Sequence, residues 1–402
     1  MAAKREPVQE RDIQGMKYLD LLLPMLDRLH SVGCQRDKAG NRKLHYDHYC
    51  LLALLFLFNP LVRSLRGLQQ ASELKKVQRR LGCSRAALGS LSEAVDVFDP
   101  TRLEEIVREL LGKIPENHDV GRGHVKQALT AVDGSIVKTL CSLTEAAYLR
   151  DKNGRTHCAW RFNTHFSIDR GVPEKMEVST AGNSGKGNER EHLRQRLEAD
   201  RCYVLDRWYG DFSLWNQIVA HDSSYVVRLK DNANLDRVIE ERTLSAEAIQ
   251  AGLLRDFVVK MGHGQLPDHP VHVVMVKTTP HKKRGRAAGG TTGPTSDGIL
   301  RIATNLVDVR AEVIADIYRH RWTIELFFRF FKHVLGCRHL LSTNPVGIQI
   351  QAYMAIIACL LIHLWMGGKP TLRTYEMVCL YLQGWADEEE LIAHIKKLTR
   401  AR

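Results

Sequence analysis

The sequence predicts a mixed α/β protein whose sheet-containing core lies between helical segments. Three observations support this prediction. Apolar residues recur at helical spacing up to about residue 111, and from residue 125 the pattern changes to alternating, β-branched stretches. After about residue 308 the spacing becomes helical again. Because ligands collect beyond strand ends in mixed sheets, polar residues at those positions are the first candidates for a site.

Composition narrows the classes of partner. The 402 residues allow two or three domains, and 44% hydrophobic with 26% charged residues is ordinary for a globular protein. A net charge of +12 and a pI near 9.3 favour a polyanionic partner, usually nucleic acid. The charged N-terminus lacks the apolar stretch of a signal peptide, so we expect a cytoplasmic protein.

Cysteine usage argues against a zinc ribbon and against a disulfide framework. The chain has nine cysteines and no C-x2-C pair, which is typical of buried thiols in a reducing cytoplasm. His45, His48 and Cys50 are close in sequence but do not form a complete set of metal ligands.

The N-terminal third reads as helices. Apolar spacing predicts helices over 13–31 and 46–58, and another from Asp99-Pro100 to about Leu111. Between them, 64–94 has the rhythm of a helix-turn-helix with a break at 82–84. Its cations suit phosphate contacts, although a purely structural helix corner is the alternative; they are Lys75, Lys76, Arg79, Arg80 and Arg85.

Strands follow from residue 125. The first ends near Asp133, before Gly134-Ser135, and further strands are expected over 160–169 and 174–180. A charged helix over 188–200 precedes a short buried strand that stops at Asp206, and a helix follows over 211–220. An aspartate thus ends two of the strands. A lone aspartate at such a position is often only a turn former.

The next stretch is β-rich. Strands are expected over 225–230, 257–260, 272–277 and 298–306, with a basic, Gly-rich loop over 281–298 that lacks the ending of a P-loop. That loop could contact DNA or be merely solvated. Asp308 is predicted to cap the helix that follows.

The stretch 317–335 has the spacing Y-x2-R-x3-E-x6-K, formed by Tyr318, Arg321, Glu325 and Lys332. In one helix these residues would share an arc of roughly 60°. The opposite face would be held in the core by Ile324, Phe327, Phe328 and Phe331. The alternative is an amphipathic helix with an Arg321–Glu325 surface pair. A break at 319–320 would place Tyr318 on a separate element.

Residues 346–366 are long and apolar enough to suggest a membrane span. Gln349, Gln351 and His363 interrupt the stretch, which favours a buried core helix. A last helical segment begins near Leu372.

Carboxylates on different elements suit hard divalent ions, and two such ions can promote phosphodiester chemistry. With Asp133, Asp206 and Glu325 in this order, the chain resembles the IS4 family of bacterial DDE transposases. The Y-R-E-K spacing matches at every position, and A-V-D-G-S (131–135) and L-D-R-W-Y (205–209) resemble the first two acidic blocks. Trp208 departs from the family, where glycine is common. The similarity covers roughly 45–380.

The resemblance implies an RNase H-like mixed sheet flanked by helices, interrupted by a β-rich insertion. It implies that Asp133, Asp206 and Glu325 hold two Mg2+ ions, for which Mn2+ can substitute. Water then frees a 3′-OH at the element end, and this hydroxyl attacks the opposite strand to form a hairpin before strand transfer. Phosphates would be bound by Tyr318, Arg321, Lys332 and Arg207.

The resemblance also implies partners and domains. The expected partners are double-stranded DNA, as terminal inverted repeats and target, and a second copy in a synaptic dimer at the bacterial nucleoid, with no membrane. The expected domains are a helical DNA-binding segment (1–123), the catalytic domain (124–222 and 305–371), the insertion (223–304) and a C-terminal helical segment (372–402) that could hold the dimer surface. The competing hypotheses are an inactive transposase-derived DNA-binding protein and an RNase H-like nuclease without strand transfer.

Overall fold

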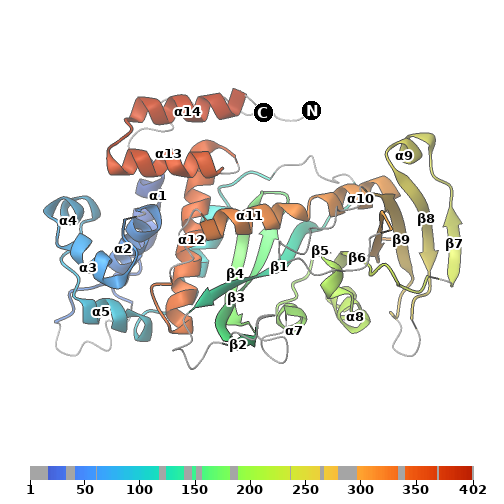
Figure 1. Cartoon of the computed structure of the whole chain (residues 1–402), viewed down its shortest axis with the longest axis horizontal. Coiled ribbons are helices and arrows are strands. Elements are labelled where there is room, and N and C mark those ends of the chain that lie inside the picture. The colour runs from blue at the N-terminus through green and yellow to red at the C-terminus, as the bar shows by residue number, and fades with distance from the viewer. Residues whose placement is uncertain are drawn as a thin grey trace.

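The fold was analysed in a computed structural model. It describes residues 17–32, 41–59, 61–116, 124–139, 147–150, 156–181, 189–235, 237–262, 267–278, 297–333, 340–368 and 371–400. Figure 1 shows an elongated molecule with helices α1–α5 at one end and strands β7–β9 at the other. Between them lies the central part of a single mixed sheet, covered by helices.

The central strands combine antiparallel and parallel pairing. They are β1 (Ala128–Thr139), β2 (Ala147–Arg150), β3 (Thr156–Ser167), β4 (Val172–Thr180), β5 (Arg201–Leu205) and β6 (Ser224–Arg228). Strands β1, β3 and β4 are antiparallel neighbours, whereas β5 lies parallel to β1, and β6 lies parallel to β5. The order β4-β3-β1-β5-β6 is RNase H-like and confirms the predicted mixed α/β fold.

The β-rich stretch continues the same sheet rather than forming a separate one. Its elements are β7 (Val238–Arg242), α9 (Ala246–Gln250), β8 (Leu253–Val259), β9 (Val271–Lys277) and β10 (Ile299–Thr304). Strand β10 pairs antiparallel with β6, and β9, β8 and β7 follow outward. Strand β6, which the sequence division grouped with the insertion, therefore lies directly beside β5. Most of the basic loop over 281–298 lies outside the described residues.

The N-terminal elements are α1 (Lys17–Asp27), α2 (Tyr46–Phe58), α3 (Leu65–Ser72), α4 (Lys75–Leu81), α5 (Leu88–Glu93) and α6 (Thr101–Leu111). The limits predicted for α2 and the C-terminal end of α6 are confirmed. The predicted helix-turn-helix is wrong in detail, because its first helix is interrupted at Glu73-Leu74 and the region forms three short helices. Gly82 ends α4 with φ of 63°, a left-handed conformation that glycine adopts without strain.

Helix α12 (Pro345–Met366) joins the N-terminal helices to the sheet. It contacts β4, α6 and α2, and 83% of its most apolar stretch is buried, as the core-helix interpretation predicts. The polar side chain of Gln349 binds the backbone of β4 at the edge of the sheet. Its Oε1 accepts a hydrogen bond from Val178 N (2.8 Å), and its Nε2 donates one to Met176 O (2.6 Å), so its amide pairs with β4.

Alternating strand residues supply two hydrophobic clusters on opposite faces of the sheet. Cys202 and Val204 of β5 belong to the cluster around α12, whereas Tyr203 and Leu205 belong to the one around α8 (Phe212–Ala220). The remaining helices are α7 (Glu189–Arg194), α10 (Ala311–Arg319), α11 (Trp322–His333), α13 (Leu372–Gln383) and α14 (Glu388–Arg400). The N-cap position of α10 is held by Arg310, which makes no side-chain capping hydrogen bond, and not by Asp308, which corrects the sequence prediction.

Candidate active site

Asp133 lies within β1, not at its end as predicted. The strand continues to Thr139 because β3 pairs with it along this whole stretch. What ends near Asp133 is the parallel pairing with β5, whose last paired residues are Ala131 and Val204. Asp133 therefore lies where β1 and β5 separate. Ligands can bind at such a point, as they do beyond the end of a strand.

Asp206 follows the last residue of β5. Its carboxylate accepts a hydrogen bond from Trp208 N at 2.8 Å and caps the short 3-10 turn Arg207–Tyr209. This cap fixes the aspartate at the carboxyl edge of the parallel strands β5 and β6. Arg207 itself is exposed in this turn.

Asp133 is the acid of the site whose pKa is most clearly changed by its surroundings. The pKa of Asp133 rises from 3.8 to about 7, chiefly because the group is buried and also because Asp206 and Glu189 lie near it. Arg321 also acts on Asp133, in the opposite direction. The electrostatics thus place two of the three predicted acids and the arginine of the signature in one neighbourhood.

Glu325 reaches this neighbourhood from α11. Its Oε1 lies 2.5 Å from Nη2 of Arg321, and the Glu325 side chain is 32% exposed against 14% for Arg321. The apolar face of α11 packs on the sheet through Phe327 against Phe166 and Phe331 against Phe162. Oxygens of Asp133, Asp206 and Glu325 do not all lie within 4.8 Å of one another. Arg321 pairs with Glu325 and also acts electrostatically on Asp133.

The segment 317–335 is two helices and not one, because the chain breaks at His320-Arg321, next to the break at 319–320 that the sequence left open. Thr323 Oγ1 donates to His320 O (2.7 Å) at the break, and His320 Nδ1 lies 2.8 Å from Asp316 O. Tyr318 therefore ends α10, and Arg321 lies in the turn.

The predicted shared face survives only for Glu325 and Lys332, which lie seven residues apart on α11. Tyr318 is nevertheless close to the signature arginine, since the Arg321 guanidinium stands 5.9 Å from its ring centre. Tyr318 is buried, and burial raises its pKa.

Glu189 is a fourth acid of the site that the sequence analysis missed. It opens α7, forms an ion pair with Arg161 of β3, and has a side chain only 13% exposed. A Cβ at Gly134 would lie 2.7 Å from its Oε1, which explains why a glycine follows Asp133. Burial and nearby Asp206 raise the pKa of Glu189. A glutamate at a helix start has no distinctive sequence signal, because acids are common there.

Arg228 was also missed. It follows Val227, the partner of Leu205, so it stands beside Asp206 at the sheet edge. It is close enough to Tyr318 to lower the pKa of that phenol, against the effect of burial. Its sequence signal, an arginine at the end of a β-branched strand, is common in proteins.

Trp208 is held against α7. Arg190 Nε donates to Trp208 O (2.5 Å), and its guanidinium stands 4.9 Å from a Trp208 ring centre. The tryptophan side chain remains 46% exposed beside Asp206 and leaves the aspartate in place.

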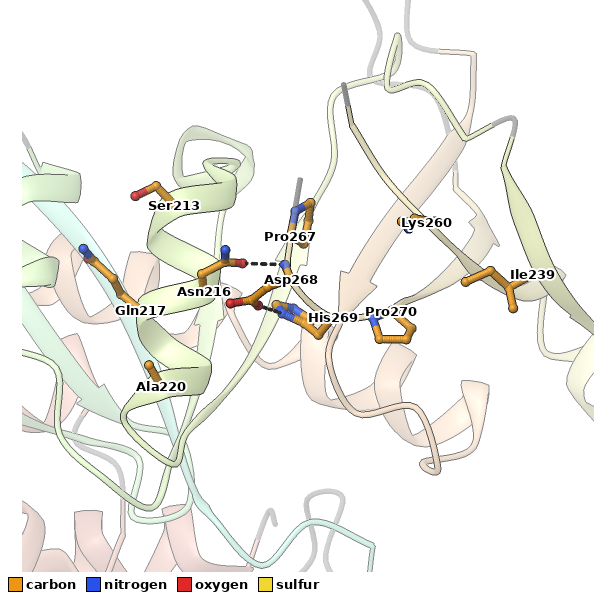
Figure 2. Close-up of a pocket in the computed structure, with 10 residues that line it drawn as sticks. All are labelled: Ser213, Asn216, Gln217, Ala220, Ile239, Lys260, Pro267, Asp268, His269 and Pro270. Carbon is orange, nitrogen blue, oxygen red and sulfur yellow. Dashed lines mark hydrogen bonds and ion pairs between the residues drawn. The ribbon is translucent and has the colours of Figure 1, made fainter. Parts of the chain in front are cut away.

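A cavity of about 880 Å3 lies away from these acids, between α8 and the insertion (Figure 2). Its lining includes Asp268 and His269, whose side chains are 2.9 Å apart. His269 Nε2 lies 3.0 Å from the hydroxyl of Tyr225. Because Tyr225 is fully buried, the hydrogen-bonded series Asp268–His269–Tyr225 presents no accessible nucleophile to the cavity. A second cavity, of about 410 Å3, is lined by Tyr318, Arg321 and Trp322 with residues of β8, β9 and β10.

Comparison with known proteins decides the family. The model of the family "Transposase DDE domain" matches residues 125–361. The chain belongs to this family. Asp133, Asp206 and Glu325 all lie within the matched range of the DDE domain, together with Tyr318, Arg321, Lys332 and Arg207.

Among curated relatives of this DDE protein is a probable transposase for insertion sequence element IS5377 from Geobacillus stearothermophilus. It is 27% identical over 213 residues, which are 53% of this chain and 50% of the relative. Putative transposase y4zB from Sinorhizobium fredii is 29% identical over 42% of this chain and 43% of its own length. The chain thus spans about half the length of these two relatives.

Two further matches are longer and more distant. A putative transposase for insertion sequence element IS4SA from Synechocystis is 20% identical over 81% of this chain and 86% of its own length. These relatives agree with the resemblance to the IS4 family. A piggyBac transposase synaptic complex with hairpin DNA aligns with 100% of this chain and 85% of its own, at 10% identity and a TM-score of 0.44. That likeness is too low to support a conclusion.

Proposed function

We propose that this DDE protein is the transposase of an insertion sequence, which cleaves phosphodiester bonds at element ends and transfers the strands to a target. One observation carries the proposal. Asp133 and Asp206 lie near each other where β1 and β5 separate, and Glu325 of α11 pairs with Arg321, which also acts electrostatically on Asp133. These elements are distant in sequence, and their acids coincide with the three expected acidic blocks.

The residues of the site fit divalent metal ions. The donors are carboxylate oxygens, which hard ions such as Mg2+ and Mn2+ prefer. Burial, together with the nearby carboxylates of Asp206 and Glu189, raises the pKa of Asp133, and a bound cation would offset the cost of ionising it. Asp133, Asp206 and Glu325 would hold the ions, and we infer that Mg2+ is the natural one. Two such ions, when bound, activate the attacking oxygen and stabilise the leaving oxygen.

The cations of the site suit the substrate strand. Arg321 presents a planar guanidinium that can bind a phosphate bidentately, while Lys332 can act as a point charge. Arg228, the last residue of β6, adds a second guanidinium close to Tyr318. Tyr318 can donate its hydroxyl to a phosphate oxygen, since burial keeps the phenol protonated. Exposed Arg207 would contact the strand as it leaves the site.

Residues outside the catalytic strands would bind the rest of the DNA. Lys75, Lys76, Arg79 and Arg85 are exposed on and just after α4, as a phosphate-contacting surface requires. We assign 1–123 to recognition of element ends, 124–222 with 305–371 to catalysis, 223–304 to the insertion, and 372–402 to a dimer surface. Two copies would bridge two ends, and cleavage would pass through a hairpin.

Glu325→Gln tests the catalytic assignment. The amide keeps the shape of the side chain but removes its charge, so binding of end DNA should persist while cleavage falls below detection. Exposed Glu105 provides a matched control, and Glu105→Gln should cleave at the wild-type rate. Normal cleavage by Glu325→Gln would exclude Glu325 from the acid set. Cleavage of any DNA by the wild type, without strand transfer, would favour a nuclease.

A further inference from the structure

A second cluster of potential metal ligands lies in the N-terminal helices, outside the DDE domain. His30 lies in the turn after α1, and Asp47 and His48 lie in the first turn of α2. One potential ligand atom from each side chain lies within 4.8 Å of those of the other two. His30 Nδ1 is 2.9 Å and His48 Nε2 is 3.7 Å from Asp47 Oδ2.

These separations are close to those of ligands on one small ion. Zn2+ binds imidazole nitrogen and carboxylate oxygen at about 2.0–2.2 Å in tetrahedral geometry, which places neighbouring ligand atoms roughly 3.4 Å apart. The His48–Asp47 distance already approximates this value. The His30–Asp47 contact, now a hydrogen bond, would lengthen by a few tenths of an ångström.

The buried groups of the cluster lack full hydrogen-bonding partners. Asp47 is 6% exposed, and within the described residues its Oδ1 accepts no hydrogen bond. Nδ1 of His48 is likewise buried without a partner there. A buried carboxylate normally requires a cation or several donors, because desolvating an unpaired charge is costly. His30, only half-exposed, supplies one donor.

The surroundings hold the cluster in a fixed geometry. His45 stacks on His30 with ring centres 3.9 Å apart, and its Nδ1 lies 3.0 Å from His30 O, so the turn is held against α2. The positive end of the α2 dipole opposes a cation, and Asp47 in its first turn offsets this effect.

We propose that His30, Asp47 and His48 bind one Zn2+ ion, which joins the turn after α1 to the start of α2. Two nitrogens and one oxygen suit zinc and its neighbours in the transition series, whereas the all-carboxylate DDE site suits Mg2+. Three protein ligands leave a fourth position for water. Since α1 and α2 both pack on α12, the ion would stabilise the helical end of the molecule. The inference is independent of the proposed transposase activity.

The test measures metal in the purified full chain. After chelator-free dialysis, the protein should retain one zinc per chain, and Co2+ should replace it with a visible ligand-field spectrum. His30→Gln and Asp47→Asn should each weaken Co2+ binding by more than about tenfold and abolish the Zn2+-dependent rise in Tm. His221→Gln, which changes an exposed histidine at the end of α8, should leave both unchanged.

The same titration in an Asp133→Asn/Glu325→Gln protein separates this site from the acids, and its spectrum should equal that of the wild type. Because His30 is half-exposed, its glutamine variant is expected to fold, and circular dichroism checks this. No retained zinc, with a cobalt spectrum identical in wild type and His30→Gln, would show a hydrogen-bonded Asp–His cluster without metal.

Discussion

At the scale of single residues, the raised pKa of Asp133 makes the stability of the fold depend on pH. Its pKa of about 7 means that the folded protein binds a proton there which the unfolded chain, near 3.8, has released. Between these values the folded state holds more protons, so the free energy of unfolding falls as pH rises through the window and stays lowered above it. A cation among the carboxylates would offset this loss.

Metal binding should therefore depend on pH. Because a metal ion must displace the Asp133 proton, the rise in Tm caused by Mn2+ should be small near about pH 5.5 and larger near about pH 8. Asp133→Asn should remove this pH dependence, whereas Asp297→Asn, at an exposed aspartate, should preserve it. Thermal melts at both pH values measure the effect, and an equal Mn2+ shift at both in the wild type would contradict it.

At the scale of elements, strong apolar periodicity predicted the limits of helices, whereas the sequence did not predict how strands pair with one another. Helices α2 and α12 have nearly the predicted limits, because their apolar stretches are long and end at clear signals. Strand β1 runs past Asp133 because β3 pairs with it, which no local signal reports. Strand β7 was missed since its side chains are mostly exposed.

In the candidate site, too, local sequence patterns predict some residues, whereas contacts between distant elements determine others. Spacing and resemblance predict Asp133, Asp206 and Glu325 as the acids of the site. In the structure Asp133 lies near Asp206, and Glu325 lies beside Arg321. Glu189 and Arg228 belong to the site through contacts across the sheet, so no sequence pattern marks them. The sequence left open a break at 319–320, and the structure has it at His320-Arg321, where Thr323 and His320 make hydrogen bonds.

Gln349 should matter to the joint between α12 and β4. Gln349→Leu removes two hydrogen bonds to the strand edge, and at about 0.5–1.5 kcal/mol each the free energy of unfolding should fall by roughly 1–3 kcal/mol. Urea unfolding followed by circular dichroism measures the change. Gln250→Leu, at an exposed position in α9, should have little effect. Equal stability of the Gln349 variant and wild type would mean that this pairing contributes little.

Helix α4 should contribute to DNA binding through its charge. Replacing Lys75, Lys76 and Arg79 with Ala should weaken binding of end DNA and reduce the slope of log K against log salt by up to about 0.9 per lost phosphate contact. The control removes the same charge from another surface of the helical segment, by changing Arg102, Arg108 and Lys113 to Ala. Similar losses of DNA binding in both variants would show that the effect depends on the net charge of the protein and not on α4.

At the scale of the whole molecule, β1, β5 and α11, the elements that carry or precede the three acids, lie between the helical end and the insertion (Figure 1). Helix α12 ties the N-terminal helices to the sheet, and β10 ties the insertion to β6. The insertion also lines the cavity beside Tyr318 and Arg321. Both ends of the molecule are thus joined to the central strands of the sheet.

The most direct test is to incubate the purified chain with Mg2+ and a duplex that carries the ends of its own element. We predict breaks at the element boundary that leave 3′-OH termini, followed by strand transfer to a second DNA, and neither product with Glu325→Gln. Breaks scattered through the duplex, or intact DNA despite specific binding of the ends, would contradict the assignment of this protein as an active transposase.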